Sequence, residues 1–533
     1  MTRALRALSV LATATIALTA CGGGGSDTDR SASGATAPDQ SERCTADRVG
    51  GTITMGEYAM LPSFAPGQGQ HGVRGGSEAA AVYDRLMRWN PDAEEFEPKL
   101  AESLEPNDDN TVWTLTLRDG VNFSNGDPVT AEDVAFTIGL HQDPATRSVA
   151  MTEALQVDEI VVVDPQTVEF TLTEAWAGFP ILLAGTGGEV IPQGVFESST
   201  PEEWARNPIG AGAFVVDSYI PDQRAVLTPN PDYYGGPVCP TLEFIRIPGS
   251  QGTYEAFQIG EVQVGFLRGA KPVTVAQDAG DRGFETITSS GSVVNLNTGA
   301  PGYDGVLTDA RARLAFAHAL DRDLIDQRLT GGVGQPTSAL IAEASRFYDG
   351  QEGPAFDVDK ATSLVNEVKA DRPDWNGELT LLIADSPENM ETGVALKALL
   401  DAAGFDVTLE NAPVTQVVAR QFTYDFEAVV GGLAVSDADP ASAFYSAFAP
   451  GGSTNISGID DPELTDAVSA FKAASDLDAQ KEALSHLQEV YNRVVPFAVL
   501  ANSEEYVVVD DSVGGVSPTL YSTVLFDGAF VKE

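Results

Sequence analysis

Histidine and cysteine are scarce in this chain of 533 residues, which has four histidines and three cysteines. The histidines stand far apart, at His71, His141, His318 and His486, and no H-E-x-x-H, Cys-x-x-Cys, Walker or G-x-S-x-G sequence occurs. These absences argue against a zinc enzyme and against a catalytic triad, and we predict neither a metal site nor a cofactor. Chemistry that uses carboxylates alone stays open.

Basic residues are also few, with 31 Lys and Arg against 78 Asp and Glu, and the formal net charge is -47. Binding to nucleic acid requires clustered Lys and Arg to neutralise phosphates, and no basic stripe occurs along the chain. We therefore expect no nucleic-acid partner. A hydrophobic fraction of 43% with 20% charged residues is typical of a globular protein rather than a disordered one.

The N-terminus has the pattern of a secretory signal peptide over residues 1–20. Arg3 and Arg6 precede an apolar run from Leu8 to Ala20, which is too short for a lasting membrane span. The run ends in "LTAC", which resembles the lipobox of bacterial lipoproteins, in which the cysteine is lipid-modified. We therefore expect Cys21 to carry lipid; the alternative is a free cysteine after an ordinary signal peptide.

A Gly- and Ser-rich stretch over residues 21–43 follows the lipobox. Such a composition cannot bury apolar surface, and we interpret it as a flexible tether that would hold the body about 25 Å from the bilayer. Cys44 and Cys239 remain. In an exported protein an even remainder of cysteines predicts a disulfide, with two separate thiols as the alternative.

Strand patterns dominate the first 270 residues, with scattered helices. The expected strands are 50–58 and 111–118, with hairpins at 159–172 and 212–230, and helices are expected at 78–88 and from Thr130 onward. Longer helical patterns follow in the rest of the chain. They predict helices at 308–329, 388–403, 461–475 and 478–493, and strands at 377–385, 405–410, 425–433 and 505–510.

Four segments together resemble the extracellular solute-binding proteins of ABC importers, family 5 (cluster C), which take peptides, nickel or oligosaccharides. They are "YDRLMRWNPDAEEFEPKLAESLEPNDDNTVWTLTLRDGVNFSNGDPVTAEDVAF" (83–136), "NPIGAGAFVVDSYIPDQRAVLTPNPDYYGG" (207–236), "VVNLNTGAPGYDGVLTDARARLAFAHALDRDLI" (293–325) and "FEAVVGGLAVSDADPASAF" (426–444). The segments lie in the order of the family and cover nearly all of the chain after the tether.

The resemblance implies an α/β fold of two lobes joined by a hinge, the periplasmic-binding-protein-like fold of type II. The first lobe would contain one subdomain of residues 44–82, 208–290 and 505–533 and an inserted subdomain of residues 83–207. The second lobe would be residues 291–504. Cys44 and Cys239 then fall within a single subdomain, in agreement with a disulfide between them.

The resemblance also implies a ligand site between the lobes. A cleft of this kind needs aromatic and apolar walls with a few fixed polar groups. For one wall we predict Tyr58, Leu61 and Phe64; the opposing wall would contain Leu433, Ser436, Asp437, Phe444 and Tyr445. Phe64 and Phe444 could equally be core residues. Arg346 and Arg420 are candidates for binding a ligand carboxylate, because a guanidinium group is geometrically suited to one.

Peptide-binding members of the family carry an Asp four residues before the Pro of the last motif, where it pairs with the α-amino group of the peptide. Here that position is Ser436, and the usual Trp is Leu433. Asp437 could replace the missing carboxylate, although adjacent residues of an extended segment point to opposite sides. Asp439, directly before Pro440, has the pattern of a turn or helix cap.

These patterns predict a lipid-anchored receptor on the outer face of the cell membrane or in the periplasm. As a monomer without catalysis of its own, it would deliver a peptide or peptide-like solute to an ABC permease and ATPase. An oligosaccharide or another organic solute is the first alternative. A hydrolase that uses Asp437 and Asp439 is a further alternative, and an adhesin or sensor subunit with the same fold is the last.

Overall fold

The computed structural model describes residues 37–67 and 76–532. The described residues all belong to one compact unit. The predicted signal peptide and lipidation site Cys21 lie outside the described residues. Within the described part, no helix has the length and apolar character that crossing a membrane requires.

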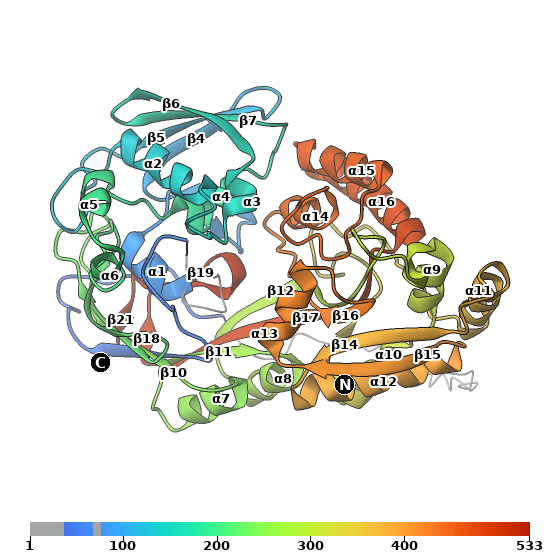
Figure 1. Ribbon diagram of the computed structural model, residues 1–533. Coiled ribbons are helices and arrows are strands. Elements are labelled where there is room, and N and C mark those ends of the chain that lie inside the picture. The colour runs from blue at the N-terminus through green and yellow to red at the C-terminus, as the bar shows by residue number, and fades with distance from the viewer. Residues whose placement is uncertain (1–36, 68–75, 533) are drawn as a thin grey trace, which may run out of the picture. The chain divides into compact units, whose positions relative to one another are not determined.

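Among the described residues, eleven strands form the largest sheet (Figure 1). The order is β15 (Asp406–Ala412), β14 (Glu378–Ala384), β16 (Ala428–Gly431), β12 (Gly283–Leu296), β17 (Phe497–Val509), β11 (Val264–Arg268), β1 (Thr52–Glu57), β10 (Thr241–Arg246), β9 (Arg224–Pro229) and β8 (Phe214–Ile220), and β13 (Gln335–Pro336) pairs with β17 beside this path. β1 runs parallel to both of its neighbours, whereas β12 runs antiparallel to β16 and β17.

The long strands β12 and β17 connect the two ends of this sheet. The first part of β12 pairs with the part of β17 that also contacts β11, and its last part pairs with β16. Between Thr288 and Val293 the register with β17 shifts, and Ser290 has a φ of 51°. Irregularities of this kind bend and twist a strand. The predicted domain boundaries at 290/291 and 504/505 fall on these two strands, and the domain boundaries stay a prediction.

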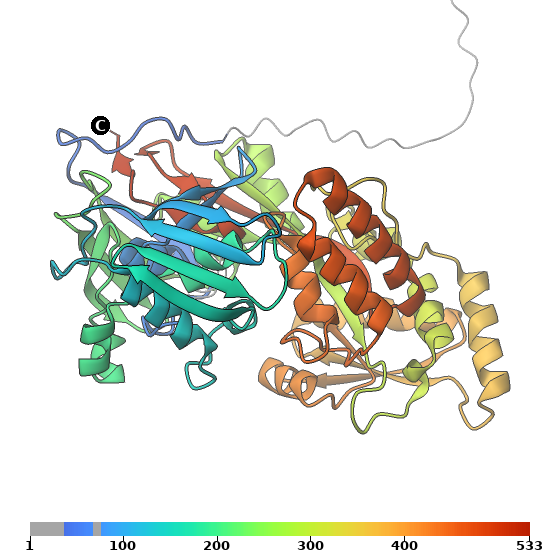
Figure 2. The same cartoon turned by 90° about the horizontal axis from the view of Figure 1, so that it is seen from above.

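A separate antiparallel sheet lies within the range predicted for the inserted subdomain. Its order is β4 (Ala101–Pro106), β5 (Val112–Leu117), β7 (Thr167–Leu172) and β6 (Val157–Asp164). Along β5 the buried residues alternate with more exposed ones, as the period of a half-buried strand requires. Helix α2 (Ala131–Gln142) contacts β6 and β7 and begins with a capping box between Thr130 and Asp133. Figure 2 shows this sheet from above.

Shorter elements complete the same range. They are β2 (Met87–Asn90), β3 (Glu95–Pro98), α3 (Met151–Ala154), α4 (Pro180–Ala184), η1 (Thr186–Gly188), α5 (Gln193–Ser198) and α6 (Pro201–Trp204). The chain around β1 adds α1 (Gly76–Tyr83), α7 (Ser250–Gln258), α8 (Ala270–Ala279), β18 (Val513–Gly514), β19 (Ser517–Pro518), η3 (Leu520–Ser522), β20 (Val524–Leu525) and β21 (Phe530–Val531).

The range predicted for the second lobe places helices around β14, β15 and β16. They are η2 (Val306–Thr308), α9 (Ala310–His318), α10 (Arg322–Leu329), α11 (Val358–Asp371), α12 (Pro387–Ala402), α13 (Val414–Phe422), α14 (Pro440–Phe448), α15 (Pro462–Ala473) and α16 (Leu477–Val494). α12 connects the parallel strands β14 and β15, as predicted, and Gly404 with a φ of 99° follows it. α15 and α16 lie side by side in both views (Figures 1 and 2).

Two helix predictions were wrong in their extent. The helix expected over 78–88 ends at Tyr83, because Asp84 adopts a left-handed conformation with a φ of 58°. The helix expected over 308–329 is two helices, α9 and α10. The Asp321 side chain accepts a hydrogen bond from the Leu324 N–H and so begins the second one. Both predicted hairpins are present.

The predicted disulfide between Cys44 and Cys239 is present, with 5.7 Å between the two Cα atoms and a sequence separation of 195. Both cysteines are buried beside Phe530. Three segments far apart in the chain therefore meet at this point, which lies next to the first residues of β1 and β10.

Candidate functional site

The segment after β16 lies against the irregular part of β12. The Leu433 N–H donates to the Ser290 carbonyl at 3.1 Å, and Val435 exchanges backbone hydrogen bonds with Ser289. Gly432 permits this approach, since a Cβ atom there would lie 2.5 Å from the Gly291 carbonyl oxygen. The predicted second-lobe wall therefore starts at the point where β12 changes register.

Ser436 and Asp437 follow, and both are half-buried. The Ser436 Oγ accepts a hydrogen bond from the Ala438 N–H at 3.2 Å. The Asp437 carboxylate accepts one from the Ser345 hydroxyl. Burial raises the pKa of Asp437, and the hydroxyl of Ser345 and the charge of Arg346 oppose that rise.

Arg346 joins this segment to Glu94, directly before β3, in the range predicted for the inserted subdomain. Its guanidinium donates to the Glu94 carbonyl at 2.9 Å and to the Ala438 carbonyl at 3.4 Å. It also lies over the rings of Trp89 and Phe347, at 5.1 and 4.6 Å from their centroids. The predicted role of Arg346 toward a ligand carboxylate stays a prediction, but the side chain does lie between the predicted lobes.

Asp439 begins α14, as its position before Pro440 predicted. Its carboxylate accepts from the Ala441 N–H at 3.2 Å, which is the contact of a helix cap. The other carboxylate oxygen accepts from the indole N–H of Trp176, in the range predicted for the inserted subdomain, at 2.8 Å. Burial raises the pKa of Asp439, and the Trp176 N–H is the first of several groups that oppose the rise. No sequence pattern indicates the contact between Asp439 and Trp176.

Lys472, at the end of α15, is a second polar residue that sequence reasoning missed. Its side chain is 1% exposed, and its ammonium donates to Gln156 at 2.6 Å and to Glu174 at 2.8 Å. The ammonium also lies over the rings of Tyr445, at 4.3 Å, and Trp176, at 5.2 Å. Tyr445, a predicted wall residue, therefore contacts the chain's own lysine.

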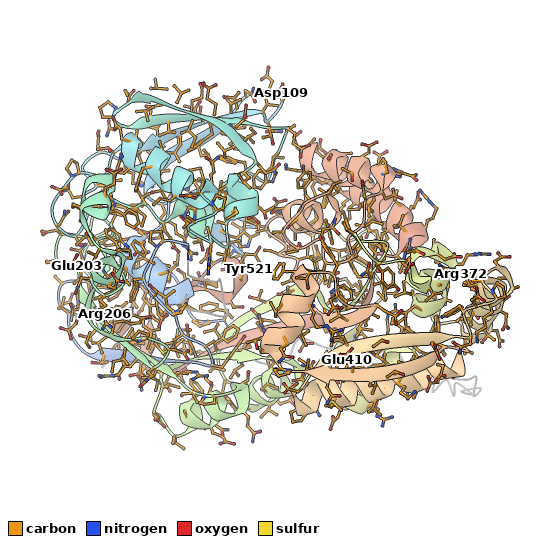
Figure 3. All side chains as sticks on the ribbon, viewed as in Figure 1. Asp109, Glu203, Arg206, Arg372, Glu410 and Tyr521 are labelled. Atoms are coloured by element: carbon orange, nitrogen blue, oxygen red, sulfur yellow. A yellow bond between two sulfur atoms is a disulfide. The ribbon has the colours of Figure 1, made fainter. Side chains whose placement is uncertain are left out.

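Two further hydrogen bonds connect α3 with residues 442 and 453. The Ser442 hydroxyl donates to the Glu153 carboxylate at 3.3 Å, and the Thr152 hydroxyl donates to Ser453 at 2.6 Å. Burial raises the pKa of Glu153, and the negative charge of Asp439 raises it further. Tyr521, labelled in Figure 3, has its own pKa raised by burial and by the charges of Glu153 and Asp439.

The predicted first wall has a different character. Leu61 and Phe64 are each 1% exposed and belong to a hydrophobic core. Phe64 meets the ring of Tyr219 edge-on at 5.0 Å, and the Leu61 N–H donates to Glu78 at 2.9 Å. Burial raises the pKa of Glu78 to about 7, while the Leu61 N–H opposes the rise. The positions of Leu61 and Phe64 favour the packing interpretation, and their contact with a ligand stays a prediction.

The remaining predicted residues are spread over several places. The Tyr58 hydroxyl accepts from Arg268 at 3.0 Å, and its ring lies 5.7 Å from that of Phe266. Phe444 is completely buried and stacks on Phe448 at 5.8 Å, which again favours a core residue. Arg420 forms an ion pair with Glu410 at 2.6 Å, so it is not brought together with the segment after β16.

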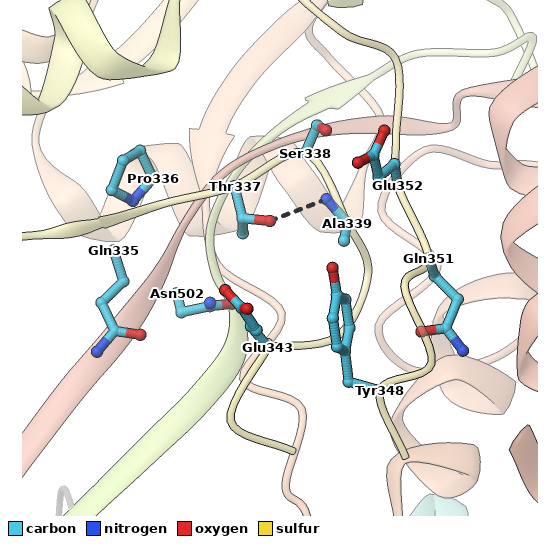
Figure 4. Close-up of a pocket in the computed structure, with 10 residues that line it drawn as sticks. All are labelled: Gln335, Pro336, Thr337, Ser338, Ala339, Glu343, Tyr348, Gln351, Glu352 and Asn502. Carbon is cyan, nitrogen blue, oxygen red and sulfur yellow. Dashed lines mark hydrogen bonds between the residues drawn. The ribbon is translucent and has the colours of Figure 1, made fainter. Parts of the chain in front are cut away.

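Two cavities lie within the second-lobe range. One of about 430 Å³ is shown in Figure 4, where the Thr337 hydroxyl accepts from the Ala339 N–H. Its lining is Gln335, Pro336, Thr337, Ser338, Ala339, Glu343, Tyr348, Gln351, Glu352 and Asn502. The other, of about 410 Å³, includes Arg420 and Glu410 in its lining. Among the described residues, no group of three His, Cys, Asp or Glu side chains is arranged to hold a metal ion.

Comparison with known proteins identifies the family. The model of the bacterial extracellular solute-binding proteins, family 5, matches residues 95–455. The chain belongs to this family. Members of the family bind solutes and are not enzymes, which contradicts the hydrolase alternative.

Individual proteins agree with this assignment. The dipeptide-binding protein of Escherichia coli (strain K12) is 24% identical over 472 residues, which cover 82% of this chain and 87% of that protein. Among solved structures, the dipeptide-binding protein of Pseudoalteromonas sp. SM9913 in complex with Met-Leu has a TM-score of 0.75 at 19% identity, and covers 90% of this chain and 100% of its own.

A structure with a different ligand has the same fold. AgaA of A. tumefaciens R10 in complex with agropinic acid has a TM-score of 0.75 at 21% identity and covers 91% of this chain and 99% of its own. These likenesses confirm the predicted two-lobe α/β fold.

Proposed function

We propose that this protein captures a peptide or peptide-like solute between its two lobes and delivers it to the permease and ATPase of an ABC importer. The match of the family 5 model over residues 95–455 carries the proposal, because this range includes most of the predicted inserted subdomain and the segment after β16. The dipeptide-binding relative supports the choice of a peptide.

Capture would use the two long strands as a hinge. A solute that contacts both lobes binds the closed arrangement better than the open one, so it shifts the population toward closure. Contacts from Trp176 to Asp439 and from Glu94 to Arg346 bring protein groups of the two sides together around the segment after β16. Closure is then the difference that a permease would recognise.

The second candidate is the same transport role for an oligosaccharide or another organic solute. In peptide-binding members an Asp at the position of Ser436 pairs with the α-amino group, and the Ser436 hydroxyl has no charge to do so. Asp437 is held by Ser345 with Arg346 nearby, which weakens it as a substitute for that Asp. These observations favour a solute that does not depend on an ammonium group at this position.

A thermal-shift experiment tests the choice of solute. Dipeptides, tripeptides, N-acetylated peptides and oligosaccharides are each added to the protein at up to millimolar concentration. A solute present at 100 times its Kd stabilises the folded state by about 2.7 kcal/mol and raises the Tm accordingly. A rise with peptides supports the proposal. A rise with an oligosaccharide alone would replace it by the second candidate.

We further propose that Cys21 carries lipid and holds a monomeric receptor at the outer face of the membrane. The lipobox-like "LTAC" and the Gly- and Ser-rich residues after it support this. Labelling of the producing cells with a fatty acid should mark the protein, and Cys21→Ala should abolish the label. Labelling that persists in Cys21→Ala would contradict the assignment.

A further inference from the structure

Lys472 is placed by α15 at the edge of the second lobe. Leu464, Val468 and Phe471 of the same helix enter a hydrophobic core, and Lys472 follows in the last turn. A cation is favourable at the C-terminal end of a helix, but here it is also withdrawn from water. Burial lowers the pKa of the ammonium, whereas the hydrogen bond and charge of Glu174 oppose that change. A buried ammonium requires acceptors to replace water.

The acceptors come from the other side of the cleft. Gln156 and Glu174 both belong to the inserted subdomain and lie 2.6 and 2.8 Å from the Lys472 Nζ. The Thr173 hydroxyl donates to the same Gln156 oxygen at 3.3 Å, which helps to fix its position. The Ala177 N–H, five residues after the end of β7, donates to the Lys472 carbonyl at 3.1 Å.

Two aromatic rings complete the surroundings, one from each lobe. Tyr445 belongs to α14 of the second lobe, and Trp176 belongs to the inserted subdomain. If the lobes separate, the ammonium keeps the ring of Tyr445 but loses Gln156, Glu174 and the ring of Trp176. The contacts that compensate its burial are therefore mostly contacts across the cleft.

We propose that Lys472 is a lobe-closing residue, whose ammonium on the second lobe is bound by Gln156, Glu174 and Trp176 of the inserted subdomain. It is a positioning residue, since it acts on the arrangement of the lobes. Its importance for transport rests on the proposed function, because closure matters to a protein that captures a solute between lobes.

The competing interpretation is that Lys472 only stabilises the end of α15. Lys369 provides the matched control, because it makes similar contacts within the second lobe alone. Its ammonium donates to the Gly404 carbonyl at 2.7 Å and lies 5.7 Å from the centroid of Trp375. Loss of Lys369 should therefore affect stability without affecting the distance between the lobes.

Pulsed EPR distances test the proposal. Spin-labelled non-canonical amino acids replace Asp158 and Asp478, which are exposed on the inserted subdomain and the second lobe. Lys472→Met and Glu174→Gln are compared with Lys369→Met in the full chain, without added solute. Removal of one partner of a buried charged pair should lower the ratio of short-distance to long-distance populations about tenfold or more. Lys369→Met should leave the distribution unchanged.

The effects of Lys472→Met and Glu174→Gln on the distance distribution should be less than additive when the two are combined, because both remove the same contact. An unchanged distribution in both Lys472→Met and Glu174→Gln would overturn the proposal, as would an equal shift in Lys369→Met. If Lys472→Met does not fold, Glu174→Gln decides alone, since the Glu174 side chain is 33% exposed and its change is tolerable. Thermal shifts with solutes are measured separately. If no solute raised the Tm, that outcome would refute the proposed function, whereas the EPR result on Lys472 would be unaffected.

Discussion

The two walls predicted for the cleft are built differently. The first wall, at Leu61 and Phe64, is held by burial within one hydrophobic core of its own lobe. The second, from Ser436 to Tyr445, also has polar contacts to the range predicted for the inserted subdomain, such as those of Asp439 with Trp176 and of Ser442 with Glu153. Changes at the first wall should therefore alter folding stability, and changes at the second should alter how the lobes meet.

The largest effect is expected at the first wall. Phe64→Ala removes a ring that is 1% exposed and packed against Tyr219, and should reduce the free energy of unfolding by about 3–5 kcal/mol. Phe422→Ala is the control, because Phe422 is 64% exposed and its loss should cost less than about 0.5 kcal/mol. Urea unfolding measures both. A small loss for Phe64→Ala, with a clear loss of solute affinity, would show that Phe64 is a pocket residue after all.

Sequence patterns alone do not predict most of this difference between the two walls. The segment 431–448 could be located because its motif is contiguous, and the cap at Asp439 follows from Pro440 alone. The partner of Asp439 could not be found, because Trp176 lies 263 residues away and its surroundings have no distinguishing pattern. Lys472 has the appearance of an ordinary surface lysine next to Phe471, so only the fold shows its burial. The strands and hairpins were predictable because their signals are local, whereas the helix breaks at Asp84 and Asp321 depend on conformations that periodicity does not encode.

A pH dependence should distinguish the first wall further. Burial raises the pKa of Glu78 from 4.5 to about 7 in the folded state, so the folded state binds this proton more tightly than the unfolded state does. Its contribution therefore makes the protein less stable as the pH rises from about 4.5 to 7, by roughly 3 kcal/mol in total. Glu78→Gln should remove that part of the dependence.

Chemical unfolding at several pH values between 4 and 8 measures this effect. Exposed Glu102 provides the control, and Glu102→Gln should leave the dependence attributed to Glu78 in place. Glu189, whose pKa burial also raises to about 7, adds a similar dependence that remains in Glu78→Gln. A parental and a Glu78→Gln curve of identical slope would show that Glu78 is not the group that titrates.

A smaller effect is expected from the contact between Trp176 and Asp439. Trp176→Phe removes the N–H and leaves a buried carboxylate oxygen without this donor, at a cost of about 1–3 kcal/mol. The cost should fall on the closed arrangement, and should appear as a longer distance between spin labels on the two lobes. Trp204→Phe is the matched control, since the Trp204 N–H donates at 3.1 Å to the Tyr83 hydroxyl, away from the second lobe. Equal label distances in the two variants would contradict the claim that changes at the second wall alter how the lobes meet.

The smallest effect on stability is expected at Ser436. Its hydroxyl accepts only a local hydrogen bond from the Ala438 N–H, so Ser436→Ala should change the free energy of unfolding by about 0.5–1.5 kcal/mol. Its effect on solute affinity should be larger if Ser436 lines the ligand site. Ser436→Asp supplies the charge found in peptide-binding members, and should strengthen binding of a dipeptide with a free amino group over its N-acetylated form. The two affinities, measured by calorimetry, should change in opposite directions; equal changes would mean that the position does not face the solute and that the second wall lies elsewhere.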